Sequence, residues 1–146
     1  KAVKSFLSDT SSFSPEWSGS ILRMLPESVR GAYPLLREHL RILSAGICIG
    51  EAKGKDFIPA EELALSTALR PDAFPVADLD WDDAIRYLKK EALLLPAGTE
   101  KGYVLVRHKK FPLGFAKHLG NRANNLYPQE WRIRTGYVPE QVKTFE

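Results

Sequence analysis

The sequence is poor in cysteine and contains no long apolar run. Its single cysteine, Cys48, cannot form an internal disulfide, which fits a protein of the cytoplasm. The longest apolar stretch runs from Ile42 to Ile49, contains Ser44 and Gly46, and is too short for a membrane span of about 18 to 20 residues. The chain begins with lysine and we expect no signal peptide, so we predict an excised piece of a longer cytoplasmic protein that makes no membrane contact.

Signatures of catalysis and metal binding are also missing. No Gly-x-Gly-x-x-Gly turn with an acidic residue about twenty positions beyond it follows a predicted strand. Cys48 lies between two isoleucines, and an apolar environment raises the pKa of a thiol and makes it unreactive. His108 and His118 have no cysteine or aspartate at ligand spacing. We therefore expect no catalytic residue, metal or cofactor in this chain, since a complete small enzyme would require a reactive Cys48.

Charge is distributed unevenly along the sequence. Residues 1–100 carry 12 Lys/Arg and 15 Asp/Glu, whereas residues 101–134 carry eight Lys/Arg against one acid, Glu130. Such a run is commonly only a solvated face, but a compact basic segment also attracts polyanions. The charge distribution predicts that the basic segment attracts a polyanion and that the acidic part before it is better suited to contacts with protein.

The residue pattern predicts an α+β fold in which mixed helices and strands give way to strands alone after Pro96-Ala97-Gly98. Before this point we expect a strand at 20–25, a short helix around Pro34, two strands joined near Ala45-Gly46, a strand ending at Ile58, and helices beginning at Pro59 and Asp80. The last helix should bury one face that includes Trp81. Beyond it we expect strands at 103–107 and 114–117 and turns at 120–121 and 124–125, forming a small twisted sheet or partly closed barrel.

The segment from Gly102 to Arg132 combines a strand with particular residues at fixed spacing. After the strand come Pro112-Leu113-Gly114, Ala116-Lys117, Gly120, Arg122, Asn125 and Tyr127-Pro128. This signature resembles the PUA-like RNA-binding domain of RsmF-type methyltransferases, Sun-family enzymes that methylate cytosine C5 in small-subunit ribosomal RNA. Residues 21–88 are similar, in the same order but with a weaker motif, to the first C-terminal domain of that family. Asn124 departs from the pattern, because the family usually has a lysine there that would contact a phosphate.

The resemblance implies a lead-in segment at 1–20, the first C-terminal domain at 21–95 and a β-rich, PUA-like pseudo-barrel at 96–146. It implies two partners: small-subunit (16S) ribosomal RNA, and the protein's own N-terminal methyltransferase domain. S-adenosylmethionine would be the cofactor of that separate domain and not of this chain. The chain would then be a non-catalytic region that positions ribosomal RNA.

RNA recognition requires cations along a groove, accessible backbone N–H groups and aromatic faces for stacking. The preferred cations are Lys117, Arg122 and Arg107, although solubility alone would also explain lysine and arginine here. Glycines would admit a phosphate close to the backbone, asparagines would bond sugar or base edges, and Tyr127 would either stack on a base or anchor a turn. The candidate RNA-binding residues are Arg107, Lys109, Gly114, Lys117, Gly120, Asn121, Arg122, Asn125, Tyr127 and Arg132.

A different interpretation is a protein-interaction module that docks on ribosomal proteins or dimerises. It would use Phe111, Phe115 and Trp131 if their side chains are exposed. The two interpretations differ in their salt dependence, because phosphate binding weakens steeply with salt and an apolar interface does not.

Overall fold

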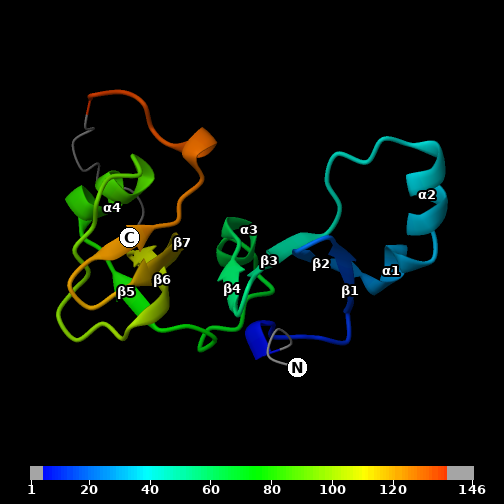
Figure 1. Cartoon of the computed structure of the whole chain (residues 1–146), viewed down its shortest axis with the longest axis horizontal. Helices are drawn as coiled ribbons and strands as arrows, with labels where there is room; N and C mark the ends of the chain where they lie inside the picture. The colour runs from blue at the N-terminus through cyan, green and yellow to red at the C-terminus, as the bar shows by residue number, and fades with distance from the viewer. Residues whose placement is uncertain (1–4, 138–146) are drawn as a thin grey trace. The chain divides into compact units, whose positions relative to one another are not determined.

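The computed structural model describes residues 5–137 of a chain that divides into two compact units between Phe74 and Pro75. Each unit contains one four-stranded sheet and few helical residues, which confirms the α+β class (Figure 1). The division falls well before the boundary expected at residue 96. The reason is that the segment from Pro75 to Leu95 packs with the strands that follow it, as described below.

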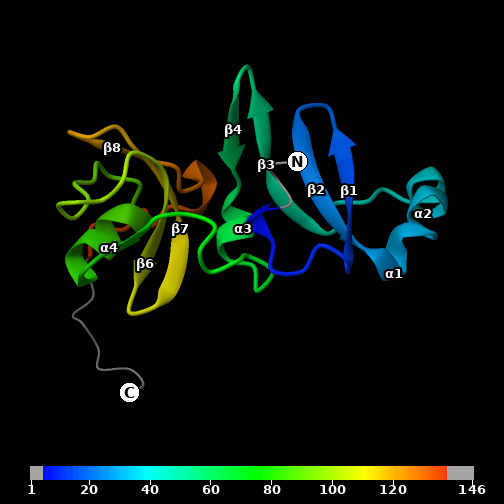
Figure 2. The ribbon, with the colours of Figure 1, turned by 90° about the horizontal axis from the view of Figure 1, so that it is seen from below.

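The first unit is built on an antiparallel sheet with the strand order β1-β2-β3-β4 (Figure 2). Its strands are β1 (Phe13–Ser18), β2 (Ile21–Pro26), β3 (Ile47–Lys53) and β4 (Asp56–Pro59). β1 lies inside the segment that we expected to be a lead-in, and it pairs with β2 along its whole length. The serine-rich composition of this segment gives little apolar alternation, so the strand has no clear signature in the sequence.

Three short helices belong to the first unit: α1 (Glu27–Arg30), α2 (Tyr33–His39) and α3 (Glu61–Ala64). α2 carries Pro34 in its first turn as expected, but it buries none of its residues. α3 begins near the expected position and places Leu63 and Ala64 in the core. It ends sooner than the pattern suggests, and just beyond it the hydroxyl of Ser66 accepts a hydrogen bond from the Ala68 N–H at 3.0 Å.

The strand expected between Leu40 and Ala45 does not form. Gly46 has φ +64°, and a Cβ at this position would lie 2.2 Å from the carbonyl oxygen of Met24. Only glycine fits this close approach to β2, so the backbone turns here and β3 starts at the next residue.

The second unit is built on a sheet with the strand order β5-β6-β7-β8. Its strands are β5 (Val76–Asp78), β6 (Gly102–His108), β7 (Phe111–His118) and β8 (Ala123–Asn125). β5 runs parallel to β6, and the other neighbours are antiparallel. Within residues 75–137 the strands form a β-rich sheet, as expected for a PUA-like domain, and this sheet is not closed into a barrel.

Helix α4 (Trp81–Leu88) contributes Ala84 and Tyr87 to the core of the second unit. Asp80 caps it as predicted, because its carboxylate accepts a hydrogen bond from the Asp83 N–H at 2.9 Å. Tyr87 is fully buried, and its hydroxyl donates to the carbonyl of Phe115 in β7 at 3.0 Å. Trp81, which we expected in the core, is only partly buried and packs edge-on against His108.

The position of the division also changes the charge of each part. Residues 1–74 contain nine Lys/Arg and nine Asp/Glu, so the first unit is neutral. The acidic run from Asp78 to Asp83 belongs to the second unit instead. The acidic charge from which we predicted a protein-contacting lobe is therefore not a property of the first unit, and the protein contact itself stays a prediction. Within the described residues, no helix combines the length and the apolar character that crossing a membrane demands.

Candidate nucleic-acid interface

Three of the candidate residues, Gly120, Asn121 and Arg122, lie in the turn between β7 and β8. The Leu119 N–H donates to the carbonyl of Arg122 at 2.9 Å and closes this turn. Gly120 has φ +105°, and a Cβ there would lie 2.8 Å from Cε of Lys101, so the lysine stem passes directly over the glycine. All three turn residues and Lys101 are exposed. The turn thus brings two cations, Lys101 and Arg122, to one exposed piece of backbone.

The β7–β8 turn borders an open groove of about 690 Å³ between β8 and the end of α4. Three cations line the groove: Arg86, Lys90 and Arg122. Arg86 forms an ion pair with Asp83 at 3.5 Å, and Lys90 donates to the carbonyls of Asn125 and Tyr127. Arg122 differs from both, because its guanidinium has no hydrogen bond or ion pair with any residue from 5 to 137. It is therefore the groove cation that is available to an external anion.

Lys117 lies on β7 next to the same turn, but its ammonium group is already engaged. Its Nζ lies 3.4 Å from the hydroxyl of Tyr103 and 4.9 Å from the centre of that ring. This is a cation–π contact within the sheet, since Lys117 and Tyr103 are directly paired across β6 and β7. A phosphate would have to share this lysine with Tyr103.

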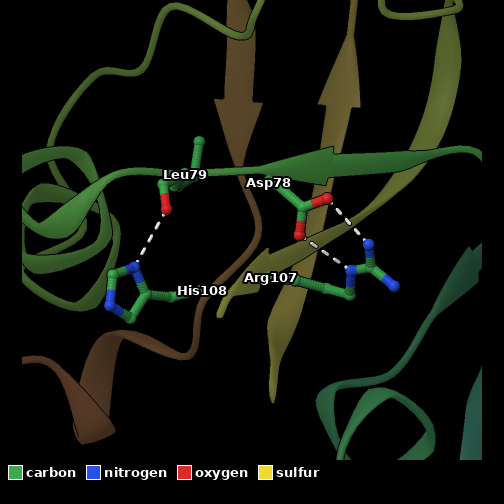
Figure 3. A network of polar contacts seen from close by, with 4 residues as sticks. All are labelled: Asp78, Leu79, Arg107 and His108. Atoms are coloured by element: carbon green, nitrogen blue, oxygen red, sulfur yellow. Dashed lines mark hydrogen bonds and ion pairs between the residues drawn. The ribbon is translucent and has the colours of Figure 1, made fainter. Parts of the chain in front are cut away.

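Arg107 is neutralised by a carboxylate from the neighbouring strand (Figure 3). Its Nε and Nη2 donate to the two carboxylate oxygens of Asp78 at 3.0 and 2.7 Å. These hydrogen bonds hold the pKa of Asp78 below its usual range and raise the pKa of Arg107. A phosphate could bind Arg107 only by sharing its guanidinium with Asp78, so the role of Arg107 as a phosphate cation stays a prediction.

Two other candidates, Gly114 and Asn125, have structural roles within the sheet. Gly114 is buried in β7 opposite Val106, so it cannot admit a phosphate. The side-chain amide of Asn125 donates to the carbonyls of Tyr87 and Glu91, and its oxygen accepts from the Tyr127 N–H. These contacts tie β8 to the end of α4 and leave no donor of the amide for a base edge.

Tyr127 packs into the core of the second unit. Its ring contacts Tyr87 edge-on, with centroids 5.4 Å apart, and Trp131, with centroids 6.4 Å apart. Of the two roles considered for this tyrosine, the structure supports the turn anchor over the stacking platform. Lys109 and Arg132 are exposed and have no ion pair or hydrogen bond within residues 5–137; Lys109 lies in the turn between β6 and β7.

The residues expected to serve protein docking, catalysis or metal binding differ in how well the structure suits them to those roles. Phe115 is fully buried, whereas Phe111 is 72% exposed and Trp131 is 48% exposed. The pKa of the Cys48 thiol is raised, chiefly by burial, which is the opposite of what a nucleophile needs. Among the residues described, no three His, Cys, Asp or Glu side chains gather in a way that could hold a metal ion.

The extent of the second unit can be compared with known families. Residues 74–133 match the family model described as the methyltransferase RsmF PUA domain, and this stretch covers most of the second unit. The second unit is an RsmF-type PUA domain. The α4 helix and strand β5 therefore belong to the PUA domain, in agreement with the division seen in the structure.

Several curated proteins that are similar to this chain share one name. Proteins called ribosomal RNA small subunit methyltransferase F, from Shewanella baltica (strain OS195) and Shewanella pealeana, are 32% identical to this chain over 110 and 92 residues. The similarity covers 72% and 62% of this chain but 22% and 18% of those relatives. The chain thus spans about a fifth of the length of the curated relatives that it matches.

Two exposed cations of the PUA domain, Lys101 and Lys110, were not singled out from the sequence. Both belong to the basic run, but a run by itself does not show which of its members lack a partner in the fold. Lys101 could have been found from the predicted β6–β7 hairpin. In this hairpin Gly102 pairs with His118, which places Lys101, just before β6, beside the turn that follows β7.

Proposed function

We propose that this chain is the RNA-binding region of a small-subunit ribosomal RNA cytosine-C5 methyltransferase. Its PUA domain holds 16S ribosomal RNA while a separate N-terminal domain, which binds S-adenosylmethionine, methylates the target cytosine. The protein acts in the cytoplasm. The relatives named as ribosomal RNA small subunit methyltransferase F support the RNA substrate, and the RsmF-type PUA domain supports the assignment of binding to this part.

The observation that carries the proposal is the β7–β8 turn with its two exposed cations. The guanidinium of Arg122 borders a groove and forms no hydrogen bond or ion pair within residues 5–137. The side chain of Lys101, which precedes β6, lies over Gly120 of the turn. A phosphate at this turn would meet two positive charges, because the absence of a Cβ at Gly120 lets the Lys101 stem lie against the turn that carries Arg122. Contacts of this kind fix the register of RNA on a protein without reading its sequence.

Binding at the PUA domain would contribute to the reaction by holding the RNA near the catalytic domain. RNA held at the β7–β8 turn is no longer free to diffuse, so the catalytic domain meets its cytosine as part of one complex. The residues of this chain are suited to that division of labour, because the thiol of Cys48 has a raised pKa and lies in β3 of the other unit. Bond-making would belong to the separate domain.

The test is fluorescence anisotropy of a labelled small-subunit rRNA fragment across a salt series. We expect Lys101→Gln/Arg122→Gln to weaken binding and to make the log–log salt dependence shallower by about 1.4 to 1.8, since each neutralised phosphate contributes roughly 0.7 to 0.9. The matched control is Arg30→Gln/Arg37→Gln, which removes the same charge from exposed ion pairs of the first unit. Absence of wild-type binding at low salt, or equal losses in both double variants, would refute the proposal.

The second candidate function is docking on a ribosomal protein or dimerisation. The exposure of Trp131 and Phe111 favours it, because large apolar side chains on a surface commonly mark an interface. Analytical ultracentrifugation of the chain at two salt concentrations tests the dimer. A salt-insensitive dimer that dissociates on Trp131→Ala would favour docking over RNA binding.

A further inference from the structure

The hairpin that joins β6 and β7 has an unusual two-residue turn. His108 pairs with Phe111, so only Lys109 and Lys110 lie between the strands. Their φ angles are +47° and +73°, the left-handed values that a type I′ turn requires. Such turns favour Asn-Gly, because a lysine Cβ is disfavoured in this conformation. This chain therefore carries two cations in a turn whose backbone conformation would favour Asn and Gly.

The tip of this hairpin, which consists of Lys109, Lys110 and Phe111, has the chemistry of a nucleotide site. Phe111 exposes 72% of its surface, although it is a large apolar side chain. Neither lysine makes a hydrogen bond or an ion pair with residues 5–137. The sequence contains no Asp or Glu between Glu100 and Glu130, so no acid of the hairpin itself neutralises the two lysines. An exposed ring beside two available cations fits a base with its neighbouring phosphates.

The base of the hairpin is held rigidly, so that the tip is positioned in advance. Arg107 makes its two-pronged ion pair with Asp78, and Nδ1 of His108 lies 2.9 Å from the carbonyl oxygen of Leu79 (Figure 3). The indole of Trp81 packs edge-on against the ring of His108, with centroids 5.8 Å apart. Both residues before the turn are therefore tied to the segment that leads into α4. As a result, the tip loses little conformational freedom when it binds a ligand.

We propose that the hairpin tip is a second RNA contact that takes an unpaired nucleotide. Phe111 stacks on the base, and Lys109 and Lys110 contact the phosphates on either side of it. This inference rests on the proposed function and adds the class of RNA, a loop or bulge beside a helix. The tip and the β7–β8 turn are at opposite ends of β7, roughly 23 Å apart for an eight-residue strand at about 3.3 Å per residue. One RNA would touch both only if it extends along the strand.

The first test compares two RNAs, a hairpin with an unpaired loop and a duplex with the same stem, by anisotropy with the whole chain. We expect Phe111→Ala to weaken binding of the loop RNA by about 5- to 150-fold, the range of one lost base–aromatic stack, and to leave the duplex unchanged. Phe111→Trp, which keeps an aromatic face, is expected to retain the affinity of the wild type for the loop RNA.

The second test removes the cations without harming the turn. Lys109→Asn/Lys110→Gly installs the residues that a type I′ turn prefers, so the chain should fold at least as stably as the wild type. We expect it to bind the loop RNA more weakly, with a log–log salt dependence shallower by about 1.4, because roughly 0.7 is lost per single-strand phosphate.

The outcomes separate this inference from the proposed function. If Phe111→Ala binds the loop RNA as the wild type does, or weakens loop and duplex equally, the nucleotide site at the tip is refuted. Binding of ribosomal RNA that still depends on Lys101 and Arg122 would then leave the proposed function standing. If the wild-type chain binds neither RNA, both are refuted together.

Discussion

Replacement of Asn125 by alanine should destabilise the PUA domain without touching its RNA contacts. The side chain makes three hydrogen bonds: to the carbonyls of Tyr87 at 2.8 Å and Glu91 at 3.2 Å, and from the Tyr127 N–H at 2.9 Å. At roughly 1 kcal/mol for each bond, and with some relief from water because the site is only partly buried, we expect a loss of about 2 to 3 kcal/mol. Asn125→Asp keeps the acceptor but places a carboxylate beside two carbonyls, so it should be at least as damaging.

The matched control is the neighbouring asparagine. Asn124 is exposed, and its side chain forms no hydrogen bond with residues 5–137. Asn124→Ala should therefore change the free energy of unfolding by less than about 0.5 kcal/mol. The assay is urea unfolding followed by the NMR amide signals of Val104 and Val106, which report the PUA domain separately from the other unit.

Two results would refute this reasoning. Equal stabilities of Asn125→Ala and Asn124→Ala would show that the three hydrogen bonds contribute nothing measurable to the fold. A folded Asn125→Ala protein that had lost RNA affinity specifically would restore the role of a direct RNA contact that the sequence suggested. We expect unchanged affinity at temperatures where the variant stays folded.

Two further predictions concern ionisable groups. The pKa of Asp78 is lowered by hydrogen bonds from Arg107, so the stabilisation from this pair is complete above the ordinary aspartate pKa of about 3.9 and is lost as the pH falls through the lower pKa of the folded state. A ¹³C NMR titration should give a midpoint below about 3.9 for Asp78, and a midpoint at or above that value would contradict the pairing. The raised pKa of Cys48 predicts slow reaction with a thiol reagent at pH 8 in the native protein and fast reaction in urea, whereas equal rates would contradict burial as the cause.

The elements that the sequence predicts well are those with a local physical cause. β6 and β7 carry continuous apolar runs, and Asp80 stands where a helix cap is needed. β5 has three residues and pairs in parallel with a strand about thirty positions away, so nothing local marks it. The sequence alone therefore predicts a domain boundary at the Pro96-Ala97-Gly98 turn, whereas this turn lies inside the PUA domain.

The sequence predicts which types of residue form the candidate site. It does not show which of the cations are free of partners within the fold and can bind an external anion. Gly120, Asn121 and Arg122 lie together because they are consecutive in one turn. The neutralisation of Arg107 depends on Asp78, 29 positions earlier, and that pairing exists only once β5 and β6 are side by side. Asn125 is likewise satisfied by carbonyls at the end of a distant helix, which a linear pattern does not show.

The short outer strands of the PUA sheet have a consequence for how the domain behaves at high concentration. β5 and β8 have three residues each, and Leu93 bridges Ala123 at the outer side of β8. A second copy that approached this sheet edge-on would find few unpaired N–H and C=O groups to extend. The domain can thus keep the long β6–β7 hairpin in the centre of the sheet, with its projecting tip, while limiting the risk of strand-to-strand aggregation.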